Sequence, residues 1–138
     1  MTFASYTNKE VLAKEVENDL QQIFNNRVNI WNKLMVENIS LDDIQMQLGE
    51  FISEPLITDD MEIFEDILNN PTSYETILDV DIQDCEIIKI TRKKGVFLVK
   101  IAWTLEGYED MDYEEVEYDV DMIRKNNRWL LSDYKPRP

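Results

Sequence analysis

The chain has 138 residues with 29 acidic and 14 basic side chains, and its formal net charge is −15 at neutral pH. A surface this acidic repels DNA, RNA and anionic lipid headgroups, because these ligands are bound through Lys and Arg, so direct nucleic-acid or membrane binding is disfavoured. The absence of histidine removes the commonest general base and excludes catalytic sets that depend on it.

The length of the chain and its cysteine content further narrow the class of protein to which it can belong. A chain of this length is the size of one domain, and we expect residues 1–138 to fold as a single unit. Cys85 is the only cysteine, so an intramolecular disulfide is impossible and a reducing compartment is favoured. No signal peptide and no long apolar run are visible, and we therefore expect a cytoplasmic protein without a membrane span.

The first element that the sequence predicts is a long helix over residues 8–36. Thr7 and Glu10 stand three positions apart in a capping-box pattern, in which each side chain accepts a hydrogen bond from a backbone amide at the helix start. Apolar side chains then recur every three or four residues from Leu12 to Met35, which is the period of one helix face. A helix of this length must pack across a broad surface.

Two shorter helices are expected next. Ser40 precedes an amphipathic stretch that Gly49 would end. Thr58 or Asp59 would cap a third helix, which stops before Pro71 because proline cannot continue it.

The rest of the chain is rich in strand-forming residues. Residues 72–80 fit either an edge strand or an irregular connector. A two-residue loop at Lys94 and Gly95 would join the next two strands and place Ile90 opposite Val99.

A second hairpin is expected at Asn126 and Asn127. Asparagine tolerates the positive φ values of a tight hairpin turn better than most residues do. A two-residue loop there pairs Met122 with Leu131, so that apolar side chains share one face.

The most informative stretch alternates acidic and apolar residues. Strict alternation predicts a strand with one face in the core and the other carrying a ladder of carboxylates, which are Glu115, Glu117, Asp119 and Asp121. The turn before it adds five more acids, at Glu106, Glu109, Asp110, Asp112 and Glu114, so nine of the sixteen residues from 106 to 121 are acidic. This concentration of charge is either tolerated for solubility or used to bind a partner.

Taken together, one long helix, two short helices and a meandering sheet predict an α+β fold. With strands of the type Tyr118-Asp119-Val120-Asp121-Met122-Ile123 and Arg128-Trp129-Leu130-Leu131-Ser132-Asp133-Tyr134, the chain resembles the NTF2-like (cone-fold, nuclear transport factor 2-like) superfamily. The resemblance implies a long N-terminal helix and two short helices packed on a curved antiparallel sheet. That superfamily includes enzymes, transport adaptors, mobile-element proteins and bacterial immunity proteins, so fold does not fix function.

An enzymatic alternative rests on carboxylates. The ketosteroid isomerases, which share the cone fold, use an Asp base together with a Tyr and a protonated Asp. By analogy, an inward Tyr118 could partner Asp84, Glu86 or Asp133, since the predicted registers leave these acids on the apolar face. The simpler interpretation is that Tyr118 belongs to the core and the acids lie at sheet ends or bulges.

Metal and cofactor sites are not expected. Read as a calcium loop that begins at Asp110, the sequence has Glu115 where a glycine is needed and Asp121 where a glutamate is needed. Cys85 has no nearby Cys or His for zinc, and we interpret it as a small buried apolar residue.

We therefore predict a non-enzymatic acidic protein that binds a basic protein, such as a nuclease toxin or a nucleic-acid-handling enzyme, as an immunity protein, inhibitor or DNA mimic. The predicted partner-binding residues combine the acids with two exposed aromatic anchors: Glu106, Tyr108, Glu109, Asp110, Asp112, Tyr113, Glu115, Glu117, Asp119 and Asp121.

Three alternatives stay open. The ladder is only a solvated face if lysines neutralise it. Lys100 and, beside it, Lys89 are expected on the same outer face, with Lys100 opposite Glu117 or Asp119. A deep apolar pocket in the cone that contains an isolated carboxylate would favour a small-molecule-binding or enzymatic role, whereas a filled core under an acidic exterior would favour the binding protein. An exposed apolar sheet face would favour a homodimer or a mobile-element component, and Ile123, Leu130 and Tyr134 are expected on that outer side.

Overall fold

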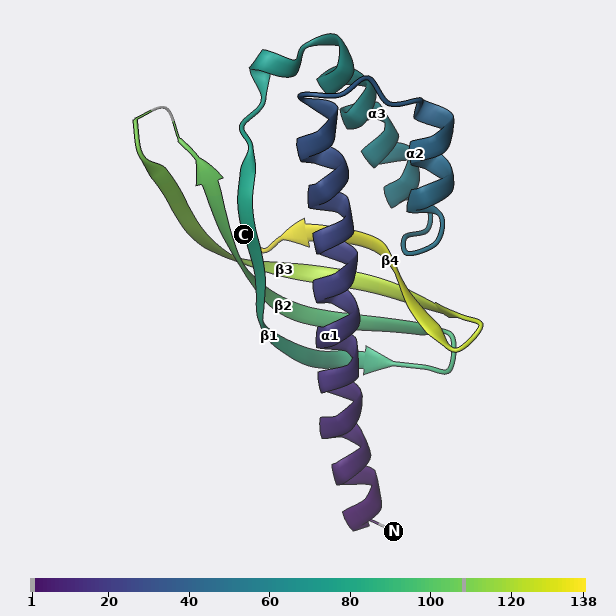
Figure 1. Cartoon of the computed structure of the whole chain (residues 1–138). Coiled ribbons are helices and arrows are strands. Elements are labelled where there is room, and N and C mark those ends of the chain that lie inside the picture. Colours follow the sequence, from purple (N-terminus) through teal and green to yellow (C-terminus); the bar gives the residue numbers. More distant parts are fainter. Residues whose placement is uncertain (1, 108) are drawn as a thin grey trace.

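The computed structural model describes residues 2–107 and 109–138, and it confirms the predicted α+β class. Four antiparallel strands form one curved sheet in the order β1-β2-β3-β4, and helix α1 lies across one of its faces (Figure 1). The elements are α1 (Thr2–Leu34), α2 (Leu41–Leu48), α3 (Leu56–Asn69), a 3₁₀ turn (Pro71–Ser73), β1 (Ile77–Ile90), β2 (Lys94–Glu106), β3 (Met111–Lys125) and β4 (Arg128–Pro136). Among the described residues, no helix combines the length and apolarity needed to cross a bilayer.

The start of α1 differs from the prediction. The helix begins at Thr2, so Thr7 and Glu10 lie within it and the capping-box interpretation is wrong. The residues before Thr7 contain no glycine or proline that would end a helix. The helix therefore continues through them, and the spacing of Thr7 and Glu10 does not indicate where it begins. The N-terminal part of α1 extends beyond the sheet (Figure 1).

Of the two short helices, α2 begins where it was predicted to begin, whereas α3 begins earlier in the chain than predicted. Helix α2 follows Ser40 and ends before Gly49, as predicted. Helix α3 begins at Leu56, two residues before the first of the two expected caps, and Pro55 is its N-cap residue, so the expected cap at Thr58 or Asp59 is wrong. The Glu54 carboxylate accepts hydrogen bonds from the backbone N–H of Thr58 at 2.8 Å and from its hydroxyl at 2.6 Å.

The β3–β4 hairpin has the predicted turn. Asn126 and Asn127 adopt φ values of 53° and 63°, and Met122 lies opposite Leu131. These positive φ values match the twist of the flanking strands, which is why asparagine is favoured there.

The β1–β2 hairpin has a different register from the one predicted. The turn lies at residues 91–93, where the N–H of Thr91 donates to the carbonyl of Lys94 at 2.8 Å. Ile90 is therefore opposite Gly95, and Val99 is opposite Cys85 rather than Ile90. Three register shifts, after Ile77, after Ile82 and after Ile87, decide which β1 side chains face the core.

The core lies between α1, the two short helices and one face of the sheet. The helical and strand periods predict eight apolar residues to be mostly buried, and the structure has them buried or, for Trp31 and Trp103, half-buried: Leu20, Phe24, Trp31, Val99, Ile101, Trp103, Val120 and Trp129. This agreement follows from the helical and strand periods alone.

The expected apolar outer patch is not formed. A register shift between Asp121 and Met122 turns Tyr134 inward, where its ring centroid lies 5.1 Å from that of Phe24. Leu130 is buried and Ile123 is half-buried. These residues therefore give no exposed apolar face that would favour a homodimer.

Side-chain amides of α1 pair with the free edge of β1. The amide of Gln21 donates to the carbonyl of Val80 at 2.8 Å and accepts from the N–H of Ile82 at 2.8 Å. The amide of Asn32 donates to the carbonyl of Ile77 at 2.8 Å and accepts from its N–H at 3.0 Å. Each amide thus replaces part of a missing neighbouring strand.

The opposite edge of the sheet is covered by the connection between α2 and α3. The N–H of Ser53 donates to the carbonyl of Leu131 at 2.8 Å, and the N–H of Leu131 donates to the carbonyl of Phe51 at 3.2 Å. β4 pairs with β3 only from Tyr118 to Lys125. The first residues of β3 therefore extend beyond β4 as part of the β2–β3 hairpin (Figure 1).

Replacement of Gln21 by Met should destabilise the protein by about 2 kcal/mol, because the backbone groups of Val80 and Ile82 would lose their partners while the side-chain volume is nearly kept. The free energy of unfolding in urea measures this loss. The same substitution at the exposed neighbour Gln22 should change stability by less than about 0.5 kcal/mol. Equal effects at both positions would contradict the pairing of α1 with the β1 edge.

Candidate functional site

The ladder residues of β3 lie together, as predicted. Glu115, Glu117, Asp119 and Asp121 are all exposed and lie on the outer face of the sheet, which is the face opposite α1. Lys100 of β2 stands directly opposite Glu117, which was one of the two predicted positions.

Strand β1 brings a second column of acids to the same face. The observed register pairs Asp81 with Ala102, Asp84 with Lys100 and Glu86 with Leu98. Residues opposite each other in adjacent strands share a face, so the prediction that Asp84 and Glu86 lie on the apolar face is wrong. The bulge after Ile82 inserts one extra residue and reverses the orientation of the side chains that follow it.

Together these residues form what we call the acidic sheet face. It consists of exposed carboxylates in two columns, one on each side of β2: Asp79, Asp81, Asp84 and Glu86 on β1, and Glu115, Glu117, Asp119 and Asp121 on β3.

The remaining predicted residues do not all join this face. Tyr113 lies opposite Thr104 on the outer face and is 60% exposed. Asp112 alternates with Tyr113 and so points to the other side of the strand. Glu106, Glu109 and Asp110 are exposed around the tip of the β2–β3 hairpin, and Tyr108 lies outside the described residues.

Cations neutralise only part of the acidic sheet face. The Lys100 ammonium lies 2.9 Å from a carboxylate oxygen of Glu115, and the Tyr113 hydroxyl donates to that carboxylate at 2.8 Å. The hydrogen bond from Lys100, followed by that from Tyr113, lowers the pKa of Glu115 below its ordinary value. Arg137 donates to Asp119 at 3.0 Å. Within the described residues, Glu117 forms no ion pair within 4.0 Å.

The carboxylates proposed as partners of Tyr118 are not brought to it. The Tyr118 hydroxyl accepts a hydrogen bond from the indole N–H of Trp103 at 2.8 Å, and burial raises the pKa of Tyr118. Asp133 accepts the N–H of Tyr134 at 3.0 Å, and its other oxygen lies 3.9 Å from Lys135. The structure thus places Tyr118 in the core, as in the simpler interpretation.

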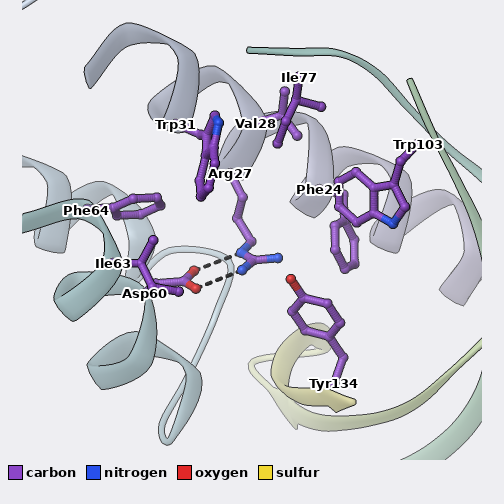
Figure 2. Close-up of a pocket in the computed structure, with 10 residues that line it drawn as sticks. All are labelled: Phe24, Arg27, Val28, Trp31, Asp60, Ile63, Phe64, Ile77, Trp103 and Tyr134. Carbon is purple, nitrogen blue, oxygen red and sulfur yellow. Dashed lines mark hydrogen bonds and ion pairs between the residues drawn. The ribbon is translucent and has the colours of Figure 1, made fainter. Parts of the chain in front are cut away.

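A partly open cavity of about 220 Å³ lies between α1, α3 and the sheet (Figure 2). Most of its lining is apolar, and five aromatic side chains contribute to it: Phe24, Trp31, Phe64, Trp103 and Tyr134. The two polar side chains besides the Tyr134 hydroxyl are Arg27 and Asp60, which form a bidentate pair across it (Figure 2).

The Arg27–Asp60 pair is almost fully buried. Nε and Nη2 of Arg27 donate to the two carboxylate oxygens at 2.8 Å and 2.7 Å, and the two side chains are 12% and 3% exposed. The guanidinium carbon also lies 4.9 Å from the centroid of the Tyr134 ring. Burial acts to lower the pKa of Arg27, but Tyr134 and Asp60 outweigh it, and the pKa lies above its ordinary value.

Sequence reasoning missed this pair, although a signal existed. Arg27 stands in the apolar stripe of α1, three residues after Phe24 and four before Trp31, and Asp60 stands four residues before Phe64 on α3. A charged residue at a core position of an amphipathic helix needs a partner. The two helices are distant in sequence, so the pairing itself could not be read from either segment.

The residues considered for metal or nucleophilic chemistry are separated or protected. In the described part of the chain, no group of three or more Asp, Glu or Cys side chains is arranged to hold a metal ion. Burial, with the nearby charges of Glu17 and Asp84, raises the pKa of the Cys85 thiol to about 12. The thiol is therefore a poor nucleophile near neutral pH.

No model of a known protein family matches this chain, and no curated protein matches its sequence. The chain is similar in structure to the intermembrane space region of the chloroplast protein ARC6, with a TM-score of 0.43 and 9% sequence identity over 84% of this chain and 95% of the other. A likeness of this size assigns neither a family nor a function.

Replacement of Asp60 by Ala should destabilise the protein by about 3–5 kcal/mol, because it leaves the Arg27 guanidinium buried without its counter-charge. The double replacement Arg27→Met with Asp60→Leu should recover most of that loss, since neither charge then remains. Urea unfolding of both variants measures the difference. A double variant no more stable than the single one would contradict this account of the pair.

Cys85 should react with iodoacetamide at pH 8 on the order of 10³-fold more slowly than an ordinary thiol of pKa ~8.5, because far less thiolate is present. Mass spectrometry of the alkylated protein follows the reaction. The same chain unfolded in urea is the matched control and should react at the ordinary rate. Fast alkylation of the folded protein would mean that the thiol is activated.

Proposed function

We propose that this chain is a non-enzymatic acidic binding protein whose acidic sheet face docks a basic protein. The observation that supports the proposal most is the pair of carboxylate columns on β1 and β3, which flank β2. On this face β2 presents Lys100 between the two columns and Lys94 at the end of the strand. The structure gives this array twice the number of acids that the β3 ladder alone contains.

The spacing of the carboxylates suits an extended basic surface. Successive acids on a regular strand lie about 6.6–6.8 Å apart, and two columns separated by one strand lie about 9.4–9.8 Å apart. Arg and Lys side chains are long enough to meet such an array from a facing surface. Carboxylates held this close also make the local electrostatic potential more negative, which attracts a cationic partner and increases its association rate.

Complementary charge increases the association rate and the selectivity for a partner, but it does not by itself give tight binding. Tight binding also needs a side chain that makes a well-packed contact with the partner. Tyr113 meets this need because it is exposed on the same face and its hydroxyl is held by Glu115. Met111 is also exposed and shares the strand face of Tyr113, two residues away. These two side chains offer apolar contact at the end of the acidic sheet face.

The partner class that fits best is a protein whose own basic surface binds nucleic acid, such as a nuclease toxin or a nucleic-acid-handling enzyme. A carboxylate array would occupy that surface in place of phosphates, as an immunity protein, inhibitor or DNA mimic does. We further propose an NTF2-like fold, which the element order supports, and a cytoplasmic location, which the unpaired Cys85 supports.

Reversal of two acids on the face, Glu86→Lys with Glu117→Lys, should remove binding to the basic partner while leaving folding nearly intact, because both side chains are exposed. The matched control reverses two exposed acids on α3, Glu62→Lys with Glu65→Lys, and changes the net charge equally. Immobilised wild-type and variant chains are compared for proteins captured from the cells that express them. The captured protein is then purified, and its association rate is measured against salt concentration.

We expect a partner that binds the wild type and the α3 control but not the sheet-face variant, with an association rate that falls as salt rises. Duplex DNA should compete with the chain if the partner is a nucleic-acid enzyme. A partner that binds all three chains at the same rate in low salt would show that the acids only keep the protein soluble.

A further inference from the structure

We propose that the cavity between α1, α3 and the sheet is a binding site for a small uncharged organic molecule that carries one ring and one oxygen acceptor, with the acceptor bonded to Arg27. This inference does not depend on the acidic sheet face. It rests on the size of the cavity, the donors that face it and the charge that surrounds it (Figure 2).

The cavity has room for a ring with a short substituent. Its volume of about 220 Å³ exceeds that of an engineered apolar cavity, roughly 150 Å³, that is known to hold benzene. The aromatic walls suit a ring, which can pack edge-on or offset against Phe24 or Trp103.

Arg27 supplies donors for the acceptor. Asp60 takes one N–H each from Nε and Nη2, while the guanidinium has five N–H groups in all. Figure 2 shows the third nitrogen on the side away from Asp60, facing the hydroxyl of Tyr134. An oxygen of a ligand that approaches this nitrogen from the cavity would receive a charge-assisted hydrogen bond.

The surrounding charge selects an uncharged ligand. Asp60 already balances the charge of Arg27, so a carboxylate ligand would bring an uncompensated negative charge into an apolar space of a protein whose formal net charge is −15. A cation would lie against the guanidinium. A neutral molecule avoids both penalties and still uses the free donors.

The cavity can be reached from solvent. Ile63 lines it and is 41% exposed, and Trp31 lines it and is half-exposed. A ligand can therefore enter without separation of α1 from the sheet.

Three probes of similar size test the proposal on the full chain. Acetophenone carries a ring and a carbonyl oxygen, ethylbenzene lacks the acceptor, and benzoate is charged. Titrations are followed through the indole N–H signals of Trp31 and Trp103 in NMR spectra. We expect acetophenone to bind saturably, about tenfold or more tightly than ethylbenzene because of the charge-assisted hydrogen bond, and more tightly than benzoate.

Two variants locate the site. Val28→Phe fills the cavity and should reduce binding of acetophenone and ethylbenzene alike, while Val36→Phe, at a position 82% exposed, should leave binding unchanged. Arg27→Met with Asp60→Leu should remove the preference for acetophenone. Thermal melts confirm that each variant is folded.

The proposal is overturned if acetophenone does not saturate, if benzoate binds more tightly, or if Val28→Phe binds acetophenone as the wild type does. It is also overturned if the Trp31 signal depends on protein concentration and no probe binds, because a second copy of the chain then covers the cavity. If Arg27→Met with Asp60→Leu does not fold, the wild-type preference for acetophenone over ethylbenzene still decides whether an acceptor is recognised.

Discussion

The arrangement of the molecule depends on how α1 is fixed to the sheet. Gln21 and Asn32 bond the backbone of β1 at its open edge, while apolar residues of the same helix pack on the inner face of the strands. A helix held in this way covers one face of the sheet and one of its edges. The other face has no core to join, and β1 and β3 present acidic side chains on it, while β2 between them presents Val96, Leu98 and Ala102 beside Lys100. The position of α1 thus decides that the core forms on one face of the sheet and that the carboxylates lie on the other.

The same helix also carries the least ordinary residue of the core. Arg27 lies between aromatic rings, and its charge is acceptable only because Asp60 of α3 meets it with both oxygens. A fully apolar residue at this position could pack without a partner. The ion pair therefore fixes the position of α3 relative to α1. It also places polar atoms in a space that apolar side chains would otherwise fill.

Much of the fold could be predicted from local patterns, because the features concerned are decided within a few residues. The turn at Asn126 and Asn127 follows from the φ values that asparagine tolerates. The predicted turn at Lys94 and Gly95 was wrong because the glycine is needed for packing and not for a turn. A Cβ added at Gly95 would lie 2.6 Å from the ring of Phe97. The bulges in β1 and the partner of Arg27 depend on distant neighbours, which is why the second acidic column and the cavity were not foreseen.

The unequal lengths of β3 and β4 have a further consequence for how copies of the chain behave toward one another. Beyond the end of β4, the first residues of β3 present backbone groups along an edge, and such edges are templates for pairing with another strand. Asp112, Glu114 and Glu115 occupy that segment, so two copies repel each other at neutral pH before their edges can meet. High ionic strength screens this repulsion, and the protein then loses a barrier to self-association.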